Sequence, residues 1–424
     1  MLRALFERIE ARREALVEFT RELVQIPTVN PPGDGYAACA RLLGDRLARS
    51  GFTVSYVRAE GEIGDSDRYP RLNVIARREG NQPGPCVHFN GHIDVVEPGL
   101  GWSVEPFAGV VRDGRLYGRG TCDMKGGIAS AVIAVESILE AGLRFPGAIE
   151  ISGTVDEESG GYAGVAYLAR QGRFSKPRVD HVIIPEPLDV DRICIGHRGV
   201  WWAQIETFGR VAHGSMPFLG DCAVRHMGAF LARLESDLLP RLAARETAMP
   251  VVPSAARHST LNIASIHGGL TEARDGLPSP MVPDRCRLLL DRRFLIEEKL
   301  DEVKAEMVEL LERLAEERPN FSYRIKDVME VLPSLTPTDA AVVEAVSAGI
   351  RQVLDKSPDL IASPGSYDQK HIQRIGHLQE CIAYGPGILE LAHQPDEYVE
   401  IDDLVAASKV MAAAALRLLG VAPA

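Results

Sequence analysis

No run of apolar residues in this 424-residue sequence approaches the roughly 18 residues that a membrane-spanning helix needs. The first residues, MLRALFERIEARREALVEFTRELVQIP, form an amphipathic charged pattern that lacks the apolar segment and cleavage site of a signal peptide. We therefore expect a cytoplasmic protein that has no membrane partner.

Cysteine and positive charge are also scarce. The seven cysteines are odd in number and include no C-x-x-C pair, which argues against a disulfide framework. The 47 Lys and Arg against 59 Asp and Glu give a net charge of −12, so we expect no nucleic-acid partner. Short-period repeats and low-complexity tracts are absent as well, which leaves an ordinary globular chain of two or three domains.

The sequence from 1 to 197 alternates between strand and helix patterns. We expect strands at 52–60, 71–80, 84–96, 147–159 and 180–187, and helices at 40–52 and 124–142. This alternation predicts an α/β domain with a mostly parallel sheet and helices on both faces.

After Gly199 the pattern changes to half-exposed strands and amphipathic helices. We expect strands at 199–209 and 285–294, and helices at 222–239 and 297–317. They predict a smaller α+β domain of ferredoxin-like type at 198–327. The β/α pattern then resumes, so this domain is inserted into a larger one made of 1–197 and 328–424.

Acidic and imidazole side chains gather where the expected strands end. His92 and Asp94 are two residues apart, so they point to the same side of one strand. Burying both is costly unless something binds them. Further acids follow other strands of this sheet, namely Asp156, Glu157, Glu158 and Glu186. Because reacting groups of α/β sheets gather beyond the carboxyl ends of the strands, this edge is the candidate site.

Each motif also has an ordinary structural explanation when it is taken alone. A strand histidine is usually a core residue, and DEES at 156–159 is typical of a helix N-terminus. GRGTCDMKGG at 118–127 fits a glycine-rich turn, although its lysine lacks P-loop spacing. His393 in LAHQPDE fits a surface residue. Together, however, these donors favour a metal site.

The order of seven motifs carries a resemblance to a known family. GHIDVV, GRGTCDMKGG, DEESGG, PEP, AHGSMP, YGPG and AHQPDE follow one another along nearly the whole chain. The sequence resembles the M20 family of co-catalytic metallopeptidases and deacylases. This family includes acetylornithine deacetylase, succinyl-diaminopimelate desuccinylase, aminoacylase and glutamate carboxypeptidase.

The resemblance implies two divalent metal ions. His92 and Glu186 would bind one ion, Glu158 and His393 the other, and Asp123 would bridge both. Imidazole and carboxylate donors without thiolate suit zinc, with manganese or cobalt as alternatives. Without cations, each close pair of carboxylates would cost about 4 kcal/mol at an effective dielectric constant near 20.

The resemblance also implies catalytic roles. Asp94 would accept the second N–H of His92, and Glu157 would be the general base for a metal-activated water. His213 in the inserted domain would reach the partner's active site in a homodimer and help hold the oxyanion. An ordinary strand-end histidine remains the alternative for His213. The peptide bond from Asp123 to Met124 is expected to be cis.

The substrate side rests on four positions that match the family. Asn262 and Arg293 would contact a substrate carboxylate, with Arg292 as a rival for the arginine's role. Gly385 and Gly387 would offer backbone N–H groups to the same carboxylate. We therefore expect a small-molecule substrate that carries a carboxylate.

The stretch SPGSYDQKHI at 363–372 departs from the family. Tyr367, Lys370 and His371 are bulky or charged where relatives are compact, which leaves the specificity open. The main hypothesis is hydrolysis of the amide of an N-acyl amino acid or dipeptide. The alternatives are hydrolysis of another C–N bond, such as an aromatic amine or amidino group, and a metal-binding protein without turnover.

Overall fold

The computed structural model describes residues 1–269 and 280–421, and it divides the chain into two compact units. The first unit comprises Met1–Gly196, Thr336–Ile361 and Tyr367–Ala424. The inserted unit comprises His197–Leu335 and Ala362–Ser366. It extends past the boundary that we expected at 327, because its last long strand continues to Val331.

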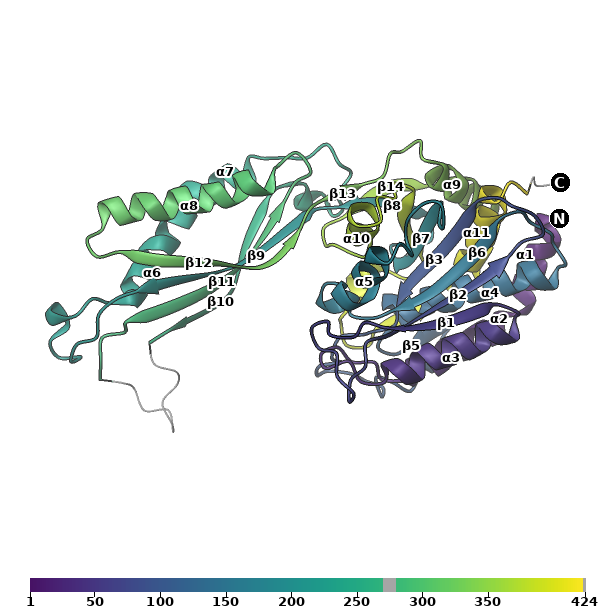
Figure 1. Cartoon of the computed structure of the whole chain (residues 1–424), viewed down its shortest axis with the longest axis horizontal. Helices are drawn as coiled ribbons and strands as arrows, with labels where there is room; N and C mark the ends of the chain where they lie inside the picture. Colours follow the sequence, from purple (N-terminus) through teal and green to yellow (C-terminus); the bar gives the residue numbers. More distant parts are fainter. Residues whose placement is uncertain (270–279, 422–424) are drawn as a thin grey trace. The chain divides into compact units, whose positions relative to one another are not determined.

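A large mixed sheet forms the centre of the first unit (Figure 1). Its strands follow the order β1 (Thr53–Arg58), β2 (Leu72–Glu79), β6 (Ala148–Thr154), β3 (Cys86–His92), β7 (His181–Pro187), β15 (Cys381–Gly385) and β8 (Arg192–His197). The central strands β6, β3, β7 and β15 are parallel, whereas β1, β2 and β8 pair antiparallel with their neighbours. The carboxyl ends of the central strands therefore meet at one edge.

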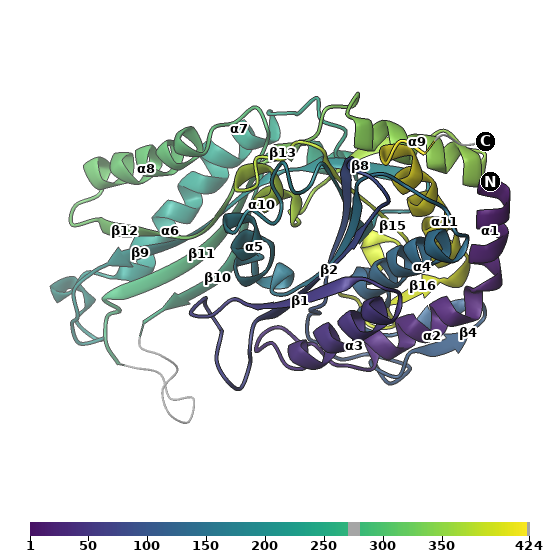
Figure 2. The same ribbon diagram turned by 45° about the vertical axis from the view of Figure 1, so that its right-hand side comes forward.

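Shorter strands and the helices complete this unit (Figure 2). The strands are β4 (Val110–Arg112), β5 (Arg115–Tyr117) and β16 (Tyr398–Glu400), which form a separate small sheet, and β14 (Asp359–Ser363), which pairs with β8. The helices are α1 (Leu2–Ala11), α2 (Arg13–Val24), α3 (Tyr36–Arg49), α4 (Gly126–Glu140), α5 (Tyr167–Arg170), α9 (Ala341–Leu354), α10 (Gln369–Arg374) and α11 (Ile401–Leu418).

Helix α4 packs closely on one face of the central sheet. Its residues are buried from Gly126 to Ile138. A Cβ atom on Gly91 of β3 would lie 2.4 Å from Cγ1 of Ile128, and one on Gly127 would lie 1.9 Å from the carbonyl oxygen of Pro185. Only glycine permits these approaches, so the sequence of small residues fixes how closely helix and sheet meet.

The opposite face of β3 is polar. Its residues His88, Asn90 and His92 are paired in register with Glu150, Ser152 and Thr154 of β6. His88 stacks on Phe174, and the Asn90 side chain donates a hydrogen bond to Asp368, immediately before α10. This polar row runs along the strand and ends with His92 at the edge of the sheet.

The inserted unit contains a four-stranded antiparallel sheet and three α-helices in its described part. The strands follow the order β10 (Thr260–Gly268), β11 (Arg285–Phe294), β9 (Gly199–Phe208) and β12 (Ser322–Val331). The helices are α6 (Ala223–Arg233), α7 (Leu239–Ala243) and α8 (Leu300–Glu317), and a two-residue strand, β13 (Ser334–Leu335), ends the unit's first segment. Trp201, Leu288, Leu290, Met307 and Leu311 belong to its apolar core.

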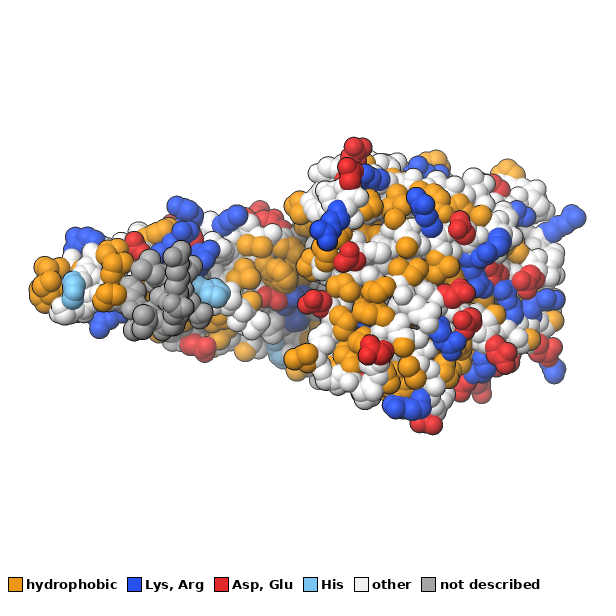
Figure 3. Space-filling model, turned by 90° about the horizontal axis from the view of Figure 1, so that it is seen from below, with side chains coloured by type: hydrophobic (Ala, Val, Ile, Leu, Met, Phe, Trp, Pro, Cys, Tyr) orange, Lys and Arg blue, Asp and Glu red, His pale blue; other side chains and the backbone are white. Residues whose placement is uncertain are grey.

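Three further observations concern the cysteines, the helices and the charged surface. All seven cysteines are free of disulfide bonds. Among the described residues, the helices are too short or too polar to cross a membrane. Lys and Arg side chains alternate with Asp and Glu on the face that Figure 3 presents.

Candidate active site

Asp123 joins two groups of possible metal ligands. One group contains His92, Asp123 and Glu186, and the other contains Asp123, Glu158 and His393; within each, the donor atoms lie within 4.8 Å of one another. Oδ1 of Asp123 is 3.0 Å from Nε2 of His92, whereas Oδ2 is 3.4 Å from Nε2 of His393. The aspartate therefore offers one oxygen to each group. Its peptide bond to Met124 is cis, as expected.

The other ligand candidates come from separate elements that meet at the carboxyl edge of the sheet. Glu186 lies in β7, and its Oε1 is 3.8 Å from Nε2 of His92. Glu158 lies in a 3-10 turn after β6, and its Oε1 is 3.0 Å from Nε2 of His393. The five side chains that the sequence predicted as ligands are thus brought together by the fold.

The electrostatics of this cluster indicate a deficit of positive charge. Burial and the charge of Asp123 raise the pKa of Glu158 to about 7 and raise that of Glu186 well above its usual value. Asp123 and Glu158 raise the pKa of His393 to about 10. Divalent cations relieve this crowding, and the imidazole and carboxylate donors fit zinc-type ions.

The orientation of His92 is set by its second ring nitrogen. Nδ1 lies 3.0 Å from the carbonyl oxygen of Asp94 and 3.6 Å from its Oδ1. An N–H at Nδ1 donates to that carbonyl, which leaves the lone pair of Nε2 for a metal. The expected acceptor was the carboxylate, so the main chain of Asp94 takes that place.

The carboxylate of Asp94 has a different set of partners. It accepts the backbone N–H of Glu157 at 3.2 Å and that of Glu158 at 3.1 Å, and it also accepts from Asn30. Asp94 therefore holds the turn that carries both glutamates.

Glu397 is a site residue that the sequence reasoning missed. Its Oε1 accepts the backbone N–H groups of Gly120, Cys122 and Asp123 at 2.9, 2.9 and 3.1 Å, and its Oε2 pairs with Arg119. The contact with Arg119 agrees with the structural role that is typical of a buried arginine. Glu397 is the last residue of the AHQPDE motif, and this position could have indicated its role, because a glutamate close to a metal ligand often supports the neighbouring ligands.

The atypical segment 363–372 enters the site through α10. Nζ of Lys370 lies 2.9 Å from Oε1 of Glu157, and Nε2 of His371 lies 2.7 Å from the carbonyl oxygen of Gly160. Lys370 and His371 thus both contact the turn that carries Glu157.

A second missed residue, Arg198, lies in the inserted unit. Its side chain is 6% exposed and donates to the carbonyl oxygens of His258 at 2.9 Å and Pro364 at 3.2 Å. Within the described chain it forms no ion pair with a carboxylate, and burial together with nearby Arg293 lowers its pKa to about 10. A buried guanidinium without an acid is typical of an anion site.

The structure distinguishes the two neighbouring arginines. Arg292 is 1% exposed and pairs with Glu298 at 2.7 Å, so it stabilises the core of the inserted unit. Arg293 points to the other side of β11, where it pairs with Asp291 at 2.7 Å and remains partly exposed. Asn262 on β10 is exposed and lies opposite Asp291 in the strand register.

His213 is exposed in the inserted unit. Its Nδ1 accepts the backbone N–H of Ser215 at 3.1 Å and lies 2.8 Å from the Ser215 hydroxyl. A neutral ring that accepts at Nδ1 carries its proton at Nε2, so His213 presents an N–H donor to its surroundings.

Gly385 and Gly387 have local packing reasons for lacking a side chain. A Cβ on Gly385 would lie 2.4 Å from the carbonyl oxygen of Pro185, and Gly387 has a φ of +95° beside Cys122. The backbone at Gly387 therefore lies next to the loop that carries Asp123.

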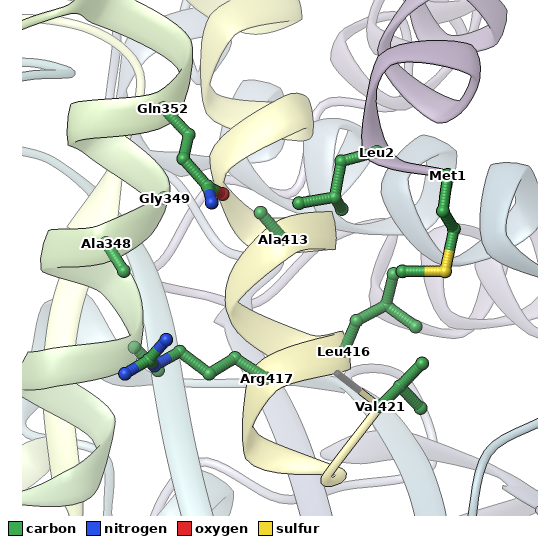
Figure 4. Close-up of a pocket in the computed structure, with 10 residues that line it drawn as sticks. Met1, Leu2, Ala348, Gly349, Gln352, Ala413, Leu416, Arg417 and Val421 are labelled. Carbon is green, nitrogen blue, oxygen red and sulfur yellow. The ribbon is translucent and has the colours of Figure 1, made fainter. Parts of the chain in front are cut away.

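A separate pocket lies between α1, α9 and α11 (Figure 4). Met1, Leu2, Gly349, Ala413 and Leu416 contribute to its lining, and the described residues that line it include no histidine, cysteine or carboxylate. It lacks the groups for metal or acid–base chemistry.

The fold and the site define a class of protein. Two groups of imidazole and carboxylate donors share one aspartate at the carboxyl edge of an α/β sheet, with another glutamate beside them. This arrangement is that of a metal-dependent hydrolase with a two-metal site.

Comparisons with known proteins identify the family. Residues 88–417 match the model of peptidase family M20/M25/M40, and the chain belongs to this family. It is therefore a metallohydrolase that acts on amide bonds.

Individual relatives agree with this assignment. The chain is 29% identical to a succinyl-diaminopimelate desuccinylase of Methylobacterium radiotolerans over 398 residues, which cover 92% of this chain and 93% of the relative. Human carnosine dipeptidase 1 has a similar fold, with a TM-score of 0.78, 20% identity and 99% coverage of both chains. The YXEP protein of Bacillus subtilis, described as a dinuclear metal-binding peptidase of the M20 family, has a TM-score of 0.70, 16% identity and coverage of 97% and 100%.

Proposed function

We propose that the protein is a deacylase that hydrolyses the amide bond of a small N-acyl amino acid or dipeptide with a free carboxylate. The observation that carries this proposal is the pair of ligand groups that share Asp123, with Glu157 adjacent to the ligand Glu158 in the same turn. The likeness to a desuccinylase over 92% of the chain supports a deacylase over a general protease.

The proposed metal site uses five ligands. His92 and Glu186 would hold one divalent ion, Glu158 and His393 would hold the other, and Asp123 would be shared between them. Zinc is the proposed metal, with manganese or cobalt as substitutes. When bound, the two cations polarise the amide carbonyl and the attacking water.

Glu157 is the proposed general base. Its carboxylate takes a proton from the attacking water and returns it to the leaving nitrogen as the C–N bond breaks, so that the carboxylate is regenerated. Asp94 supports this step by fixing the backbone of Glu157 through a 3.2 Å hydrogen bond.

The inserted unit supplies the proposed substrate contacts. Arg198 and Arg293 bind the substrate carboxylate in this proposal, because Arg198 forms no ion pair with a carboxylate of the described residues and Arg293 is partly exposed. Asn262 adds a neutral hydrogen-bonding group on the adjacent strand. Gly385 and Gly387 of the first unit offer backbone N–H groups to the same carboxylate.

We also propose that the protein acts as a homodimer in the cytoplasm. His213 of one subunit then donates its Nε2–H to the oxyanion in the partner's active site, as the accepting contact at Nδ1 allows. Seven cysteines without a disulfide bond agree with a reducing compartment.

A substrate panel tests the proposed activity. N-succinyl, N-acetyl and dipeptide substrates are assayed before chelation, after chelation and after zinc is restored, with metal content measured by elemental analysis. We expect two metals per chain and turnover of at least one N-acyl amino acid. If the loaded protein hydrolyses none of them but acts on an aromatic amine or amidino compound, the alternative C–N bond is correct.

A second experiment tests the base. Glu157→Gln should lower kcat by about 10³-fold, because general acid–base catalysis contributes about 10²–10⁴-fold. Metal content should remain at two. Glu309→Gln on the exposed surface of α8 is the matched control, since Glu309 only pairs with Arg313 there. Undiminished turnover in Glu157→Gln refutes the role of Glu157.

A further inference from the structure

Two lysines are buried in the described chain, and they are held in different ways. Nζ of Lys125 donates to the main-chain carbonyls of Leu23 and Ile26, at 3.0 and 2.8 Å, and burial lowers its pKa. Nζ of Lys370 instead donates to the carboxylate of Glu157 at 2.9 Å. Lys125 ties main-chain segments together, whereas Lys370 contacts the proposed base.

The charge of Lys370 is retained because acids surround it. Its side chain is only 3% exposed, and an unpaired ammonium in such a place costs several kcal/mol. Burial alone would lower the pKa of Lys370, but Glu157 and Asp368 outweigh that effect and raise it. The ion pair with Glu157 is therefore what makes this buried lysine stable.

The position of Lys370 is fixed by the scaffold around α10. Asp368, which precedes the helix, accepts a hydrogen bond from Asn90 of β3 at 3.1 Å. On the other side of Lys370, His371 lies 2.7 Å from the carbonyl oxygen of Gly160. The contact with Asn90 ties the segment of Lys370 to β3, and the contact of His371 with Gly160 holds α10 against the turn that carries Glu157.

Glu157 is held by hydrogen bonds at its backbone N–H and at one carboxylate oxygen, whereas its other carboxylate oxygen is accessible. Its backbone N–H donates to Asp94, and its Oε1 accepts from Lys370. Its Oε2 has no hydrogen bond within the described chain, and the side chain is 11% exposed. One carboxylate oxygen is therefore fixed while the other is accessible.

We propose that Lys370 is a positioning residue for the general base: its ammonium fixes the rotamer of Glu157, so that the free oxygen faces the reacting water and the leaving nitrogen. This inference rests on the proposed function, which makes Glu157 the base. It assigns a role to a residue in the segment 363–372, for which the expected site had no function.

The kinetic consequence is specific. A catalytic group that is misplaced by about 1 Å can cost about 10²-fold in rate. Lys370 is too buried to bind substrate directly, so its loss acts on kcat and not on KM.

Steady-state kinetics of three metal-loaded variants test the proposal. Lys370→Met should lower kcat by about 10²-fold with a KM change below about 3-fold, and metal content should stay at two. Lys370→Arg should recover about 10-fold of this loss, because a guanidinium also pairs with a carboxylate. Gln373→Met is the matched control on α10, since it removes a buried hydrogen bond to Thr336 but does not touch Glu157.

A double-mutant cycle separates positioning from a general loss of structure. If Lys370 acts through Glu157, adding Lys370→Met to Glu157→Gln lowers kcat no further. Additive losses, or a full kcat in Lys370→Met while Glu157→Gln is inactive, overturn the inference alone. Full activity of Glu157→Gln overturns the base assignment and this inference together.

A crystal structure of metal-free Lys370→Met gives a readout that is independent of activity. We expect the Glu157 carboxylate to adopt a different rotamer or several rotamers, with Asp94 still bonded to its backbone. A Glu157 side chain that stays in place after Lys370 is removed contradicts the proposal.

Discussion

The two units of the chain carry unbalanced charges of opposite sign. The first unit gathers three carboxylates, Asp123, Glu158 and Glu186, around two imidazoles at the edge of its sheet. The inserted unit buries the guanidinium of Arg198, which forms no ion pair with a described carboxylate, and keeps Arg293 partly exposed. A buried charge without a partner is costly, so these charges agree with the ligands that we propose, namely cations in the first unit and a substrate carboxylate in the inserted unit.

The largest effect is expected when the cations are removed from the first unit. Chelation should abolish turnover, because the acid cluster then holds protons in place of metal ions and no longer polarises the amide. Zinc should restore activity. Full turnover of a protein that elemental analysis finds free of metal would contradict the need for cations at the acidic cluster of the first unit.

A substitution of Arg198 tests the carboxylate contact that we propose for the inserted unit. Arg198→Met should reduce kcat/KM by about 10²-fold for a substrate with a carboxylate, the equivalent of about 3 kcal/mol for charge-assisted hydrogen bonds. The loss should shrink when the substrate carboxylate is replaced by an amide. Arg313→Met on the exposed surface of α8 is the control, and an equal loss on both substrates argues against carboxylate recognition.

The paired Arg292 sharpens the contrast through stability. Arg292→Met leaves Glu298 buried without this partner and should lower the free energy of unfolding by about 3 kcal/mol. Arg198→Met removes a cation that forms no ion pair with a described carboxylate, so we expect the free energy of unfolding to change by less than about 1 kcal/mol. Denaturant unfolding of both variants measures the difference, and equal losses contradict it.

The smallest predicted effect is a pH dependence. The pKa values of Glu158 and His393 are raised to about 7 and about 10 in the metal-free protein. Groups with raised pKa values favour the folded state at low pH, and this contribution is lost as pH rises through the folded values. Metal ions compete with these protons, so the increase in Tm caused by zinc should be larger at about pH 8 than at about pH 5.5. A constant increase in Tm contradicts the assigned ligands.

The sequence predicted those features that depend on local pattern. The two-residue period of the strand placed His92 on a polar face, and the order of motifs predicted the family and the five ligand candidates. These residues adjoin strands whose apolar patterns are clear, so their edge of the sheet was predictable.

Contacts between distant segments were not predictable in this way. Glu157 and Lys370 are separated by 213 positions, and their 2.9 Å contact depends on how α10 packs. That Arg198 forms no ion pair with a carboxylate of the described residues is a property of its surroundings, which no motif contains. The carboxylate of Asp94 likewise has backbone partners that became visible only with the turn at Glu157 and Glu158.

The hydrogen bonds between Glu397 and the loop around Asp123 have a consequence for biosynthesis. This residue comes late in translation, yet it ties down the loop around Asp123, which is made much earlier. Until residues 393–397 leave the ribosome, a nascent chain lacks both these hydrogen bonds and the imidazole of His393. With the proposed ligands, ion capture would therefore be a closing event of maturation, and prematurely terminated products would not sequester metal in this geometry.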